Sequence, residues 1–514
     1  MAQRTAIGLT GDDLTVADVW AVAVDRAPTE LTDAARVKMR AARALVERAA
    51  HGTREHTYGV NTGFGRFVNR SIPEELTGEL QLRLLRSHAC GVGEPYPDSV
   101  VRAAMLLRAN ALAKGNSGAR VETVELLLEC LNRGVLPYVP ARGSVGASGD
   151  LAPLAHLALP LVGEGRAWVE GELVDGGEAL ARVGLDPVRL LAKEGLSLIN
   201  GTQFMAAQAA LALVRARRLA RVADCACSLS LEALQGSRTS FIPQVHALRP
   251  LRGQAASARN VIRLLVDSAI IESHRWCDKV QDAYSLRCAP QVHGASRDLL
   301  DYVEYTVTTE LNAATDNPLV LVEEEMLVSA GNFHGQPLAF ALDALAMAVA
   351  ELASISERRL ERLVNPNLND GLPAFLTTDG GLNSGFMIPQ YVSAALVSEN
   401  KSLCHPASVD SIPTSAGQED HVSMGNAAGL KAWQIVANSE RALAIELLAG
   451  AQAIEFLAPL EPGRGARATY EHVRSLSPRL RDDRSLSADI EAVADCVRDG
   501  SLLAAVEAEI GELE

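Results

Sequence analysis

The apolar residues of this chain recur mainly three and four positions apart, the spacing that places them on one face of a helix. Three short segments near the start of the chain have this pattern: residues 74–87, 100–112 and 121–131. Three longer segments, rich in Ala and Leu and charged on one face, follow: residues 201–235, 336–364 and 427–456. Helices longer than about 25 residues are typical of a bundle in which helices lie side by side.

Strand patterns are few and short. Residues 167–173 and 319–328 each predict a small hairpin, and no regular alternation of strands with helices indicates a parallel sheet. The chain is therefore predicted to be all-α, with a central bundle of long helices and short hairpins in the N-terminal part.

The clearest break in the helical pattern is a Pro- and Gly-rich stretch at residues 458–465, and a softer break lies near residues 195–200. We predict three consecutive parts: an N-terminal domain over residues 1–199, a central long-helix bundle over 200–457 and a helical C-terminal tail over 458–514. The N-terminal domain contains both of the glycine-rich loops described below.

The composition is that of a globular protein with a large core, and its charge disfavours one class of partner. Of the 514 residues, 63 are acidic and 48 basic, which gives a net charge of −15. A nucleic-acid partner is therefore not expected. The one basic cluster, residues 215–221, has helical spacing and fits a solvated helix face or ion pairs between helices.

The eight cysteines are scattered, with no CxxC pair and no spacing typical of a metal site. They are expected to be reduced thiols in a cytoplasmic protein, with no bound metal. The first residues lack the pattern of a signal peptide, and the longest apolar run, residues 204–214, is too short to span a bilayer. No membrane association is expected.

Residues 143–154 form a glycine-rich loop that leads directly into an apolar helix. In Ala147-Ser148-Gly149 the amide nitrogen of Gly149 is unhindered and can attack the carbonyl carbon of Ala147. Loss of water from the ring and from Ser148 would then leave an exocyclic methylidene, an electrophile that no standard side chain supplies. Asp150 is a good N-cap for the helix, and Pro153 falls in its first turn. Taken alone, the loop also fits an ordinary helix-capping turn.

A second glycine-rich loop, residues 58–65, lacks the third glycine of a dinucleotide fingerprint and the lysine of a P-loop. It suits a mobile lid that presents Tyr58, or equally a surface turn. His88 lies where a helix ends, and a lone histidine there is more often structural than functional.

Further polar segments lie between or at the ends of the long helices. Residues 281–291 combine an amide, a phenol and a guanidinium group in Gln281, Tyr284 and Arg287. The fork of Arg287 fits a carboxylate, although a surface ion pair explains it as well. The other segments are residues 200–202, 331–337 and 418–424. If the long helices form one bundle, these segments are expected to converge.

Taken together and in order, eight of these segments resemble the aromatic amino acid ammonia-lyases, and the histidine-specific members most closely. The segments are residues 58–65, 87–93, 143–153, 200–202, 281–291, 316–318, 331–337 and 418–424. The resemblance extends over about residues 50–460. It implies that Ala147-Ser148-Gly149 forms 4-methylidene-imidazol-5-one (MIO), with no external cofactor. It also implies a fumarase/aspartase-like helical bundle that assembles as a homotetramer, with each active site drawing on three chains.

The resemblance also implies roles for single residues in catalysis. Tyr58 would be the base that removes the β-proton of the substrate. Asn200, Gln281 and Tyr284 would support the electrophile and the amine, and Phe333 would line the pocket near the ring. Because the ordinary pKa of tyrosine is near 10, Tyr58 is expected to have a lowered pKa, with help from a nearby cation.

Three further residues would bind the substrate. Arg287 would hold the carboxylate, and this is also the cation expected near Tyr58, while His88 and Glu419 occupy positions associated with the substrate side chain. Glu419 favours histidine, since a carboxylate can pair with imidazole but not with a phenyl ring. Two departures from the family pattern bear on substrate choice: Asn116 stands where relatives commonly have an aromatic residue, and Gly417 replaces a frequent asparagine.

The activity expected from these residues is elimination of ammonia from L-histidine to give trans-urocanate. A 2,3-aminomutase and a tyrosine or phenylalanine ammonia-lyase would use the same MIO group. Residues 335–337 and parts of the C-terminal tail also resemble aminomutases, but Glu419 favours the lyase. A serine hydrolase built on Ser148 would need glycine two positions later, where Asp150 stands. A helical scaffold without chemistry is the remaining alternative.

Overall fold

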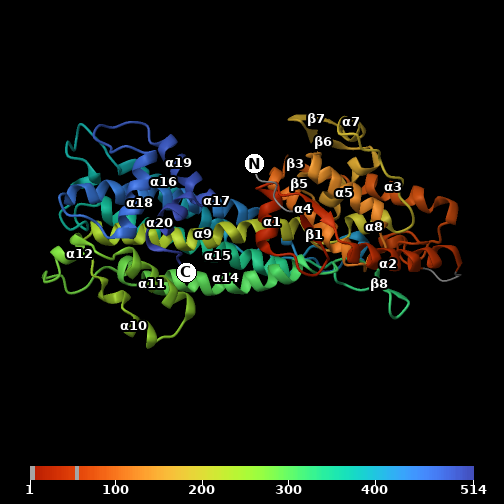
Figure 1. Cartoon of the computed structure of the whole chain (residues 1–514), viewed down its shortest axis with the longest axis horizontal. Helices are drawn as coiled ribbons and strands as arrows, with labels where there is room; N and C mark the ends of the chain where they lie inside the picture. Colours follow the sequence, from red (N-terminus) through yellow and green to blue (C-terminus); the bar gives the residue numbers. More distant parts are fainter. Residues whose placement is uncertain (1–5, 53–56) are drawn as a thin grey trace. The chain divides into compact units, whose positions relative to one another are not determined.

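The computed structural model describes residues 6–52 and 57–514 (Figure 1). Helices account for most of the described chain, and the strands are short, so the prediction of an all-α fold is confirmed. The four longest helices of the described chain are α9 (Gln203–Ala233), α14 (Ala289–Leu311), α15 (Gln336–Val364) and α17 (Gly425–Ile454). Three of them match the predicted long segments closely. The apolar pattern did not indicate α14.

The chain divides into two compact units, each built from segments far apart in the sequence. Unit 1 consists of the described residues up to Val214 together with Glu304–Asp343 and Pro406–Leu430. Unit 2 consists of Arg215–Val303, Ala344–His405 and Lys431–Glu514. The four long helices each have residues in both units. The division into three consecutive domains along the sequence stays a prediction.

Unit 1 contains most of the shorter elements of the first 200 residues. Its helices are α1 (Val16–Ala23), α2 (Asp33–Gly52), α3 (Thr77–His88), α4 (Asp98–Ala113), α5 (Val121–Arg133), α6 (Leu151–Ala158), α7 (Gly176–Arg182) and α8 (Glu194–Ile199). Its strands are β1 (Ile7–Leu9), β2 (Thr29–Leu31), β3 (Val92–Pro95), β4 (Leu136–Pro137), β5 (Pro140–Arg142), β6 (Arg166–Val169), β7 (Glu172–Asp175), β8 (Leu319–Leu321) and β9 (Met326–Val328).

The strands of unit 1 form small sheets rather than a core. β1 and β2 are parallel, β3 pairs with β5, and β4, β6 and β7 form a three-stranded antiparallel sheet. β6–β7 and β8–β9 are the two predicted hairpins, and both are confirmed. In the first, Glu170 and Gly171 both have positive φ, as a two-residue hairpin turn requires.

The core of unit 1 is organised around α4. Every residue from Val100 to Ala113 is buried, which makes α4 a helix surrounded on all sides, and it packs against α1, α2 and α5. Because polar groups inside a core must find partners, its buried Arg102, Arg108 and Asn110 all donate hydrogen bonds to backbone carbonyls.

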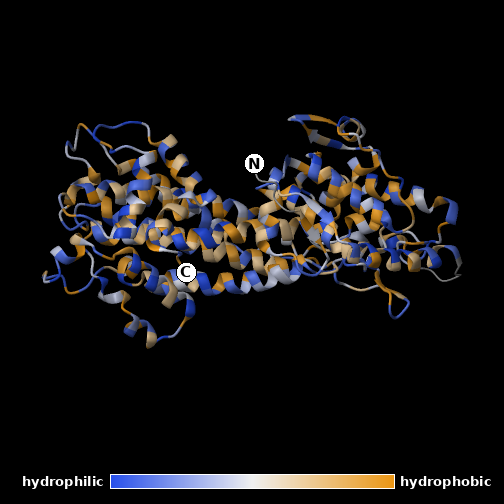
Figure 2. Cartoon of the chain, viewed as in Figure 1, coloured by the Kyte–Doolittle hydropathy of each residue, from blue (hydrophilic) through white to orange (hydrophobic). Residues whose placement is uncertain are grey.

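Unit 2 contains the remaining helices: α10 (Pro243–Ala247), α11 (Arg252–Leu264), α12 (Ala269–Ser273), α13 (Tyr284–Arg287), α16 (Met387–Leu403), α18 (Arg464–Leu476), α19 (Ser487–Asp499) and α20 (Ser501–Ile510). Apolar residues recur along its helices, whereas its outlying loops are largely hydrophilic (Figure 2). The helical tail predicted for residues 458–514 corresponds to α18, α19 and α20.

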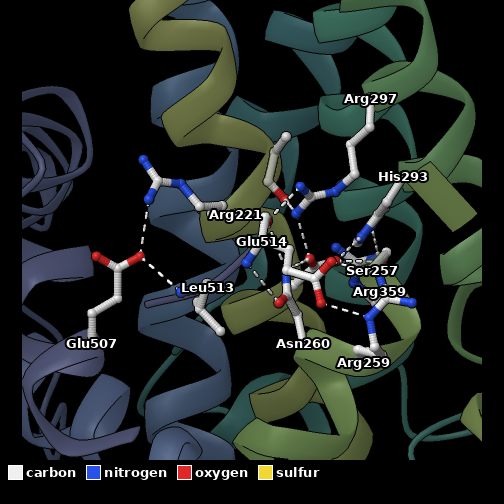
Figure 3. A network of polar contacts seen from close by, with 12 residues as sticks. Arg221, Ser257, Arg259, Asn260, His293, Arg297, Arg359, Glu507, Leu513 and Glu514 are labelled. Atoms are coloured by element: carbon white, nitrogen blue, oxygen red, sulfur yellow. Dashed lines mark hydrogen bonds and ion pairs between the residues drawn. The ribbon is translucent and has the colours of Figure 1, made fainter. Parts of the chain in front are cut away.

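A buried polar network lies in unit 2 (Figure 3). Asp224 is fully buried and accepts hydrogen bonds from Nδ1 of His293 at 2.8 Å and from Arg297 at 2.6 Å. Asn260 bonds to both Asp224 and the backbone of Glu514. The positive charge of Arg297 and the hydrogen bond from His293 overcome the effect of burial and lower the pKa of Asp224 to about 2. The carboxylate therefore stays ionised in the core.

Among the described residues, α15 is the one helix long and apolar enough, by length and composition, to cross a membrane. Most of its apolar stretch is buried inside the protein, and the core helix of a soluble protein passes the same test. This helix is therefore weak evidence for a membrane span.

Candidate active site

A cavity of about 400 Å³ in unit 1 brings together residues from seven of the eight predicted segments. The predicted site residues that line it are Tyr58, His88, Ala147, Ser148, Asn200, Phe333 and Glu419. They come from a loop before α3, the end of α3, the loop before α6, the end of α8 and the loops that precede α15 and α17. The expected convergence of these polar segments is therefore found for seven residues.

The loop that carries Ala147-Ser148-Gly149 is packed tightly against the turn between α8 and α9. Gly149 has φ +71°, and a Cβ added to it would lie 2.1 Å from the carbonyl oxygen of Gly201. The amide of Asp150 donates to the same oxygen at 2.7 Å. Only glycine fits at position 149, because both the backbone angle and the close approach exclude a side chain.

Two distant segments hold the loop from its other side. The carbonyl oxygen of Gly146 accepts hydrogen bonds from Oγ of Ser423 at 2.8 Å and from the amide of Gly335 at 3.1 Å. The amide of Met424 donates to the carbonyl of Val145 at 2.9 Å. The loop conformation thus depends on the segments that begin α15 and α17.

Asp150 is the N-cap residue of α6 by position, but its side chain forms no hydrogen bond to that helix. The carboxylate instead accepts from the amide of Met205, in the first turn of α9, at 2.9 Å and from Oγ of Ser144 at 2.8 Å. The expectation that Asp150 caps its own helix was wrong, since a helix that begins on a distant segment takes the carboxylate. Burial raises the pKa of Asp150 to about 6. Pro153 does lie in the first turn of α6.

Ser148 is bound at both its hydroxyl and its carbonyl. Oγ of Ser148 donates to Oε1 of Glu419 at 2.8 Å, and Nδ2 of Asn200 donates to the carbonyl oxygen of Ser148 at 2.9 Å. The second carboxylate oxygen of Glu419 accepts from Oγ1 of Thr414 at 2.6 Å. Oδ1 of Asn200 is buried and has no hydrogen-bond partner among the residues that the structure describes.

His88 is half-buried, and its tautomer follows from its contacts. Nδ1 lies 2.9 Å from the carbonyl oxygen of Leu84, which can only accept, so Nδ1 carries the proton. Burial lowers the pKa of His88, and the ring is therefore neutral at pH 7 with Nε2 as an acceptor.

Contrary to the expectation from the sequence, the surroundings of Tyr58 do not lower its pKa. Tyr58 packs edge-on against Phe64, and the amide of Gly65 makes a long contact of 3.5 Å to its hydroxyl oxygen. Burial and, to a lesser extent, the negative charge of Glu419 raise the pKa of Tyr58. The expected lowering of this pKa is therefore wrong for the single chain as described, in which no Lys or Arg lines the cavity.

Gln281, Tyr284 and Arg287 do not line the cavity that contains Ser148; all three belong to unit 2. Arg287 donates to Oε1 of Gln281 at 2.9 Å, and its guanidinium lies over the ring of Tyr284, 4.5 Å from the centroid. Gln281 and Arg287 line another cavity, of about 600 Å³. Tyr284 is 71% exposed. Within one chain these three residues do not join Ser148, and their place in a site shared between chains stays a prediction.

Asn116 and Gly417, the two departures from the family pattern, are both absent from the cavity lining. Asn116 bonds through its side chain and its backbone to Val320 of β8. Gly417 has φ +82° on an exposed turn next to Gln418, which does line the cavity.

The sequence places Ser423 within the polar segment 418–424 but does not indicate its role, and no pattern marks Thr414. The hydroxyl of Thr414 holds Glu419 and that of Ser423 holds the loop, and a hydroxyl in a polar loop carries no pattern that marks its partner. No group of His, Cys, Asp or Glu side chains within residues 6–52 and 57–514 could hold a metal ion.

Comparison with known proteins identifies the family. The family described as aromatic amino acid lyase matches residues 14–475. Histidine ammonia-lyase of Gloeobacter violaceus is 57% identical over 506 residues, which cover 98% of each chain. The enzyme of the same name from Myxococcus xanthus is 54% identical over 503 residues, 98% of this chain and 99% of its own.

Two solved structures show how well the fold is shared. Histidine ammonia-lyase from Trypanosoma cruzi matches with a TM-score of 0.91 and 46% identity, covering 99% of this chain and 96% of its own. Tyrosine aminomutase from Streptomyces globisporus has a TM-score of 0.94 and 37% identity, covering 99% and 100%. The chain therefore belongs to the aromatic amino acid lyase family. It is an enzyme of the carbon–nitrogen lyase class.

Proposed function

We propose that the protein is a cytoplasmic histidine ammonia-lyase, which eliminates ammonia from L-histidine and releases trans-urocanate. The observation that carries this proposal is Glu419, a carboxylate that lines the same cavity as Ser148. A carboxylate can accept a hydrogen bond from an imidazole N–H group, whereas a phenyl ring has no donor for it. The identity of 57% to a histidine ammonia-lyase supports the same substrate.

The loop fits the precursor of an MIO group. Gly149 has the unhindered amide and the left-handed backbone that ring closure onto Ala147 requires, in a cradle that a Cβ would fill. Ser144, Asn200, Ser423 and the amide of Gly335 hold the loop at its polar atoms. Once formed, MIO would supply an electrophilic carbon that takes up the substrate amine and makes it a leaving group.

The residues around the loop suit the rest of the substrate. Nε2 of His88 and the carboxylate of Glu419 are acceptors for an imidazole N–H group. Oδ1 of Asn200 is a buried acceptor without a partner among the described residues, and the substrate amine would satisfy it. Phe333 would cover one side of the pocket and exclude water.

We propose Tyr58 as the base that removes the β-proton. Because burial raises its pKa, it needs a nearby cation, and no Lys or Arg is among the described residues that line the cavity of a single chain. We propose that other copies of the chain supply Gln281, Tyr284 and Arg287 in a homotetramer. Large apolar side chains near these residues support an interface there, since Trp276 is 88% exposed and Val280 is 93% exposed.

The test uses purified full-length protein. The intact mass is expected to be lower than the sequence mass by two molecules of water, and L-histidine is expected to give the ultraviolet absorbance of trans-urocanate. A Ser148→Ala variant, which cannot lose the serine water, serves as the control. An unmodified mass would overturn the MIO proposal. A modified mass without urocanate would overturn the substrate.

The second candidate is an aminomutase, because the structural match to tyrosine aminomutase is as close as the match to a histidine ammonia-lyase. Chromatography of the products separates the two activities: a β-amino acid as the main product would establish the aminomutase. Turnover of L-tyrosine or L-phenylalanine in preference to L-histidine would establish an ammonia-lyase of different specificity.

A further inference from the structure

Arg108, in the middle of α4, is a fully buried cation directly behind the turn that supports the Ala147-Ser148-Gly149 loop. Its Nη1 donates to the carbonyl oxygen of Asn200 at 2.8 Å and to Oε1 of Gln203 at 2.9 Å. Asn200 is the C-cap residue of α8, and Gln203 is the first residue of α9. Arg108 therefore joins the two helices at the point where Asn200 enters the cavity.

The contact leaves no room between the guanidinium and the turn. A Cβ added to Gly201 would lie 2.4 Å from Nη1 of Arg108, and one added to Gly149 would lie 2.1 Å from the carbonyl oxygen of Gly201. Gly201 is thus in direct contact with Arg108 on one side and with Gly149 on the other. A displacement of the Asn200–Gly201 turn would be passed to the tripeptide, because a close-packed interior cannot absorb it.

Arg108 also remains charged. Burial lowers its pKa to about 10, which still leaves it protonated at neutral pH. The nearby carboxylate of Asp316 is taken by Lys193, whose Nζ lies 2.8 Å from it. Arg108 therefore bonds to neutral acceptors of the turn, and its hydrogen bonds are of the stronger, charge-assisted kind.

We propose that Arg108 is a positioning residue of the active site, which holds the Asn200–Gly201 turn against the loop and so fixes the amide of Asn200 at the carbonyl of Ser148. This inference rests on the proposed function and adds a residue to it. Arg108 does not line the cavity, so it acts through Asn200. It serves both the formation of the ring and the turnover that follows.

Arg102 provides a matched control on the same helix. It is 8% exposed and donates to backbone carbonyls, those of Val22 near the end of α1 and Leu131 near the end of α5, whereas Arg108 donates to a backbone carbonyl and to the side chain of Gln203. Arg102→Met and Arg108→Met therefore remove the same kind of buried group from α4, and only the second removes a contact to the site.

The experiment measures three quantities for each full-length variant: the melting temperature, the fraction of chains whose mass has fallen by two waters, and kcat and KM per modified chain. Arg108→Met is expected to reduce the modified fraction and to lower kcat about 100-fold, with KM changed less than kcat, because misplacing a group by about 1 Å has an effect of this size. Arg108→Lys keeps the charge and is expected to retain more of both quantities. Arg102→Met is expected to lower the melting temperature and leave kcat per modified chain unchanged.

A wild-type modified fraction together with a wild-type kcat in Arg108→Met would overturn the proposal, as would an equal loss of kcat in Arg102→Met. If Arg108→Met does not fold, Arg108→Lys decides, since a wild-type mass and kcat in that folded variant would also refute the role. The modified fraction is independent of substrate. If the wild-type protein loses two waters but does not act on L-histidine, the proposed substrate fails, and the mass of the Arg108 variants still tests the positioning role.

Discussion

The hydroxyl of Ser148 donates a hydrogen bond of 2.8 Å to Oε1 of Glu419. The proposed source of the electrophile is therefore bound, before ring formation, to the proposed binding group for the substrate side chain. The proposed dehydration of Ser148 would remove that hydroxyl and leave Oε1 of Glu419 available to another donor. The unmodified chain and a modified chain would thus present different cavities to a substrate.

Replacing Glu419 tests its part in substrate choice. Glu419→Gln keeps an acceptor for Ser148 and removes the charge, so the loss of two waters is expected to persist. Because a charge-assisted hydrogen bond contributes about 1.5–3 kcal/mol, kcat/KM for L-histidine is expected to fall by roughly 10- to 100-fold. The value for L-phenylalanine is expected to change much less. An equal fall for both amino acids would rule out a selective role for the carboxylate.

Gly149→Ala tests the fit of the loop. The new Cβ would meet the carbonyl oxygen of Gly201 at 2.1 Å and would also sit on a backbone with φ +71°. We expect no loss of water in the intact mass and a clear fall in melting temperature. Gly171→Ala is the matched control, because Gly171 has φ +83° with nothing within 4 Å of the added Cβ. It is expected to show the backbone strain of about 1–3 kcal/mol without any effect on the mass.

Mixing two inactive variants tests whether an active site is shared between chains. Ser148→Ala and Arg287→Ala are each expected to be inactive alone. If Ser148 and Arg287 of one site come from different chains, coexpression of the two variants in mixed oligomers should restore about a quarter of the wild-type activity. No recovery in demonstrably mixed oligomers would place both residues in the same chain's site.

The hydrogen bonds to Asp224 are expected to make the folded state less stable at acid pH than at neutral pH. The pKa of Asp224 is about 2 in the folded protein, below the ordinary value of 3.8 for aspartate. A lowered pKa stabilises the folded state above the unfolded pKa, and this contribution, about 2 kcal/mol, is lost as the pH falls from about 4 towards 2. The gap in melting temperature between wild type and Asp224→Asn is expected to be widest near pH 5–7 and to shrink towards pH 3. A gap that is constant over this range would contradict the assignment.

The long helices were predictable because their apolar faces repeat over many turns, as in α15 and α17. The helix α14 was missed, since Pro290 and Gly294 near its start and the polar residues of its exposed face weaken the pattern. Its position is fixed by packing rather than by local preference.

For the site, motifs identified the residues but not their partners. Asp150 was expected to cap α6, but in the structure its carboxylate accepts a hydrogen bond from the first turn of α9. The partner of a side chain depends on which distant segments the fold brings beside it. Arg287 is a second example. Its sequence context predicts that it binds a carboxylate, but it does not indicate whether the active site belongs to the same chain or to another copy. Arg108 could not be identified from the sequence, where it is one arginine in an apolar helix.

The hydrogen bond between Asp150 and the amide of Met205 bears on whether folding or ring formation comes first. The loop is held in shape only when the start of α9, Gly335 and the segment around Ser423 are all in place, and these positions span much of the sequence. Ring closure would therefore have to wait until the tertiary structure of unit 1 has formed. The proposed loss of two waters would then mark each molecule that has once folded correctly, and this mass difference would persist even after that molecule is denatured.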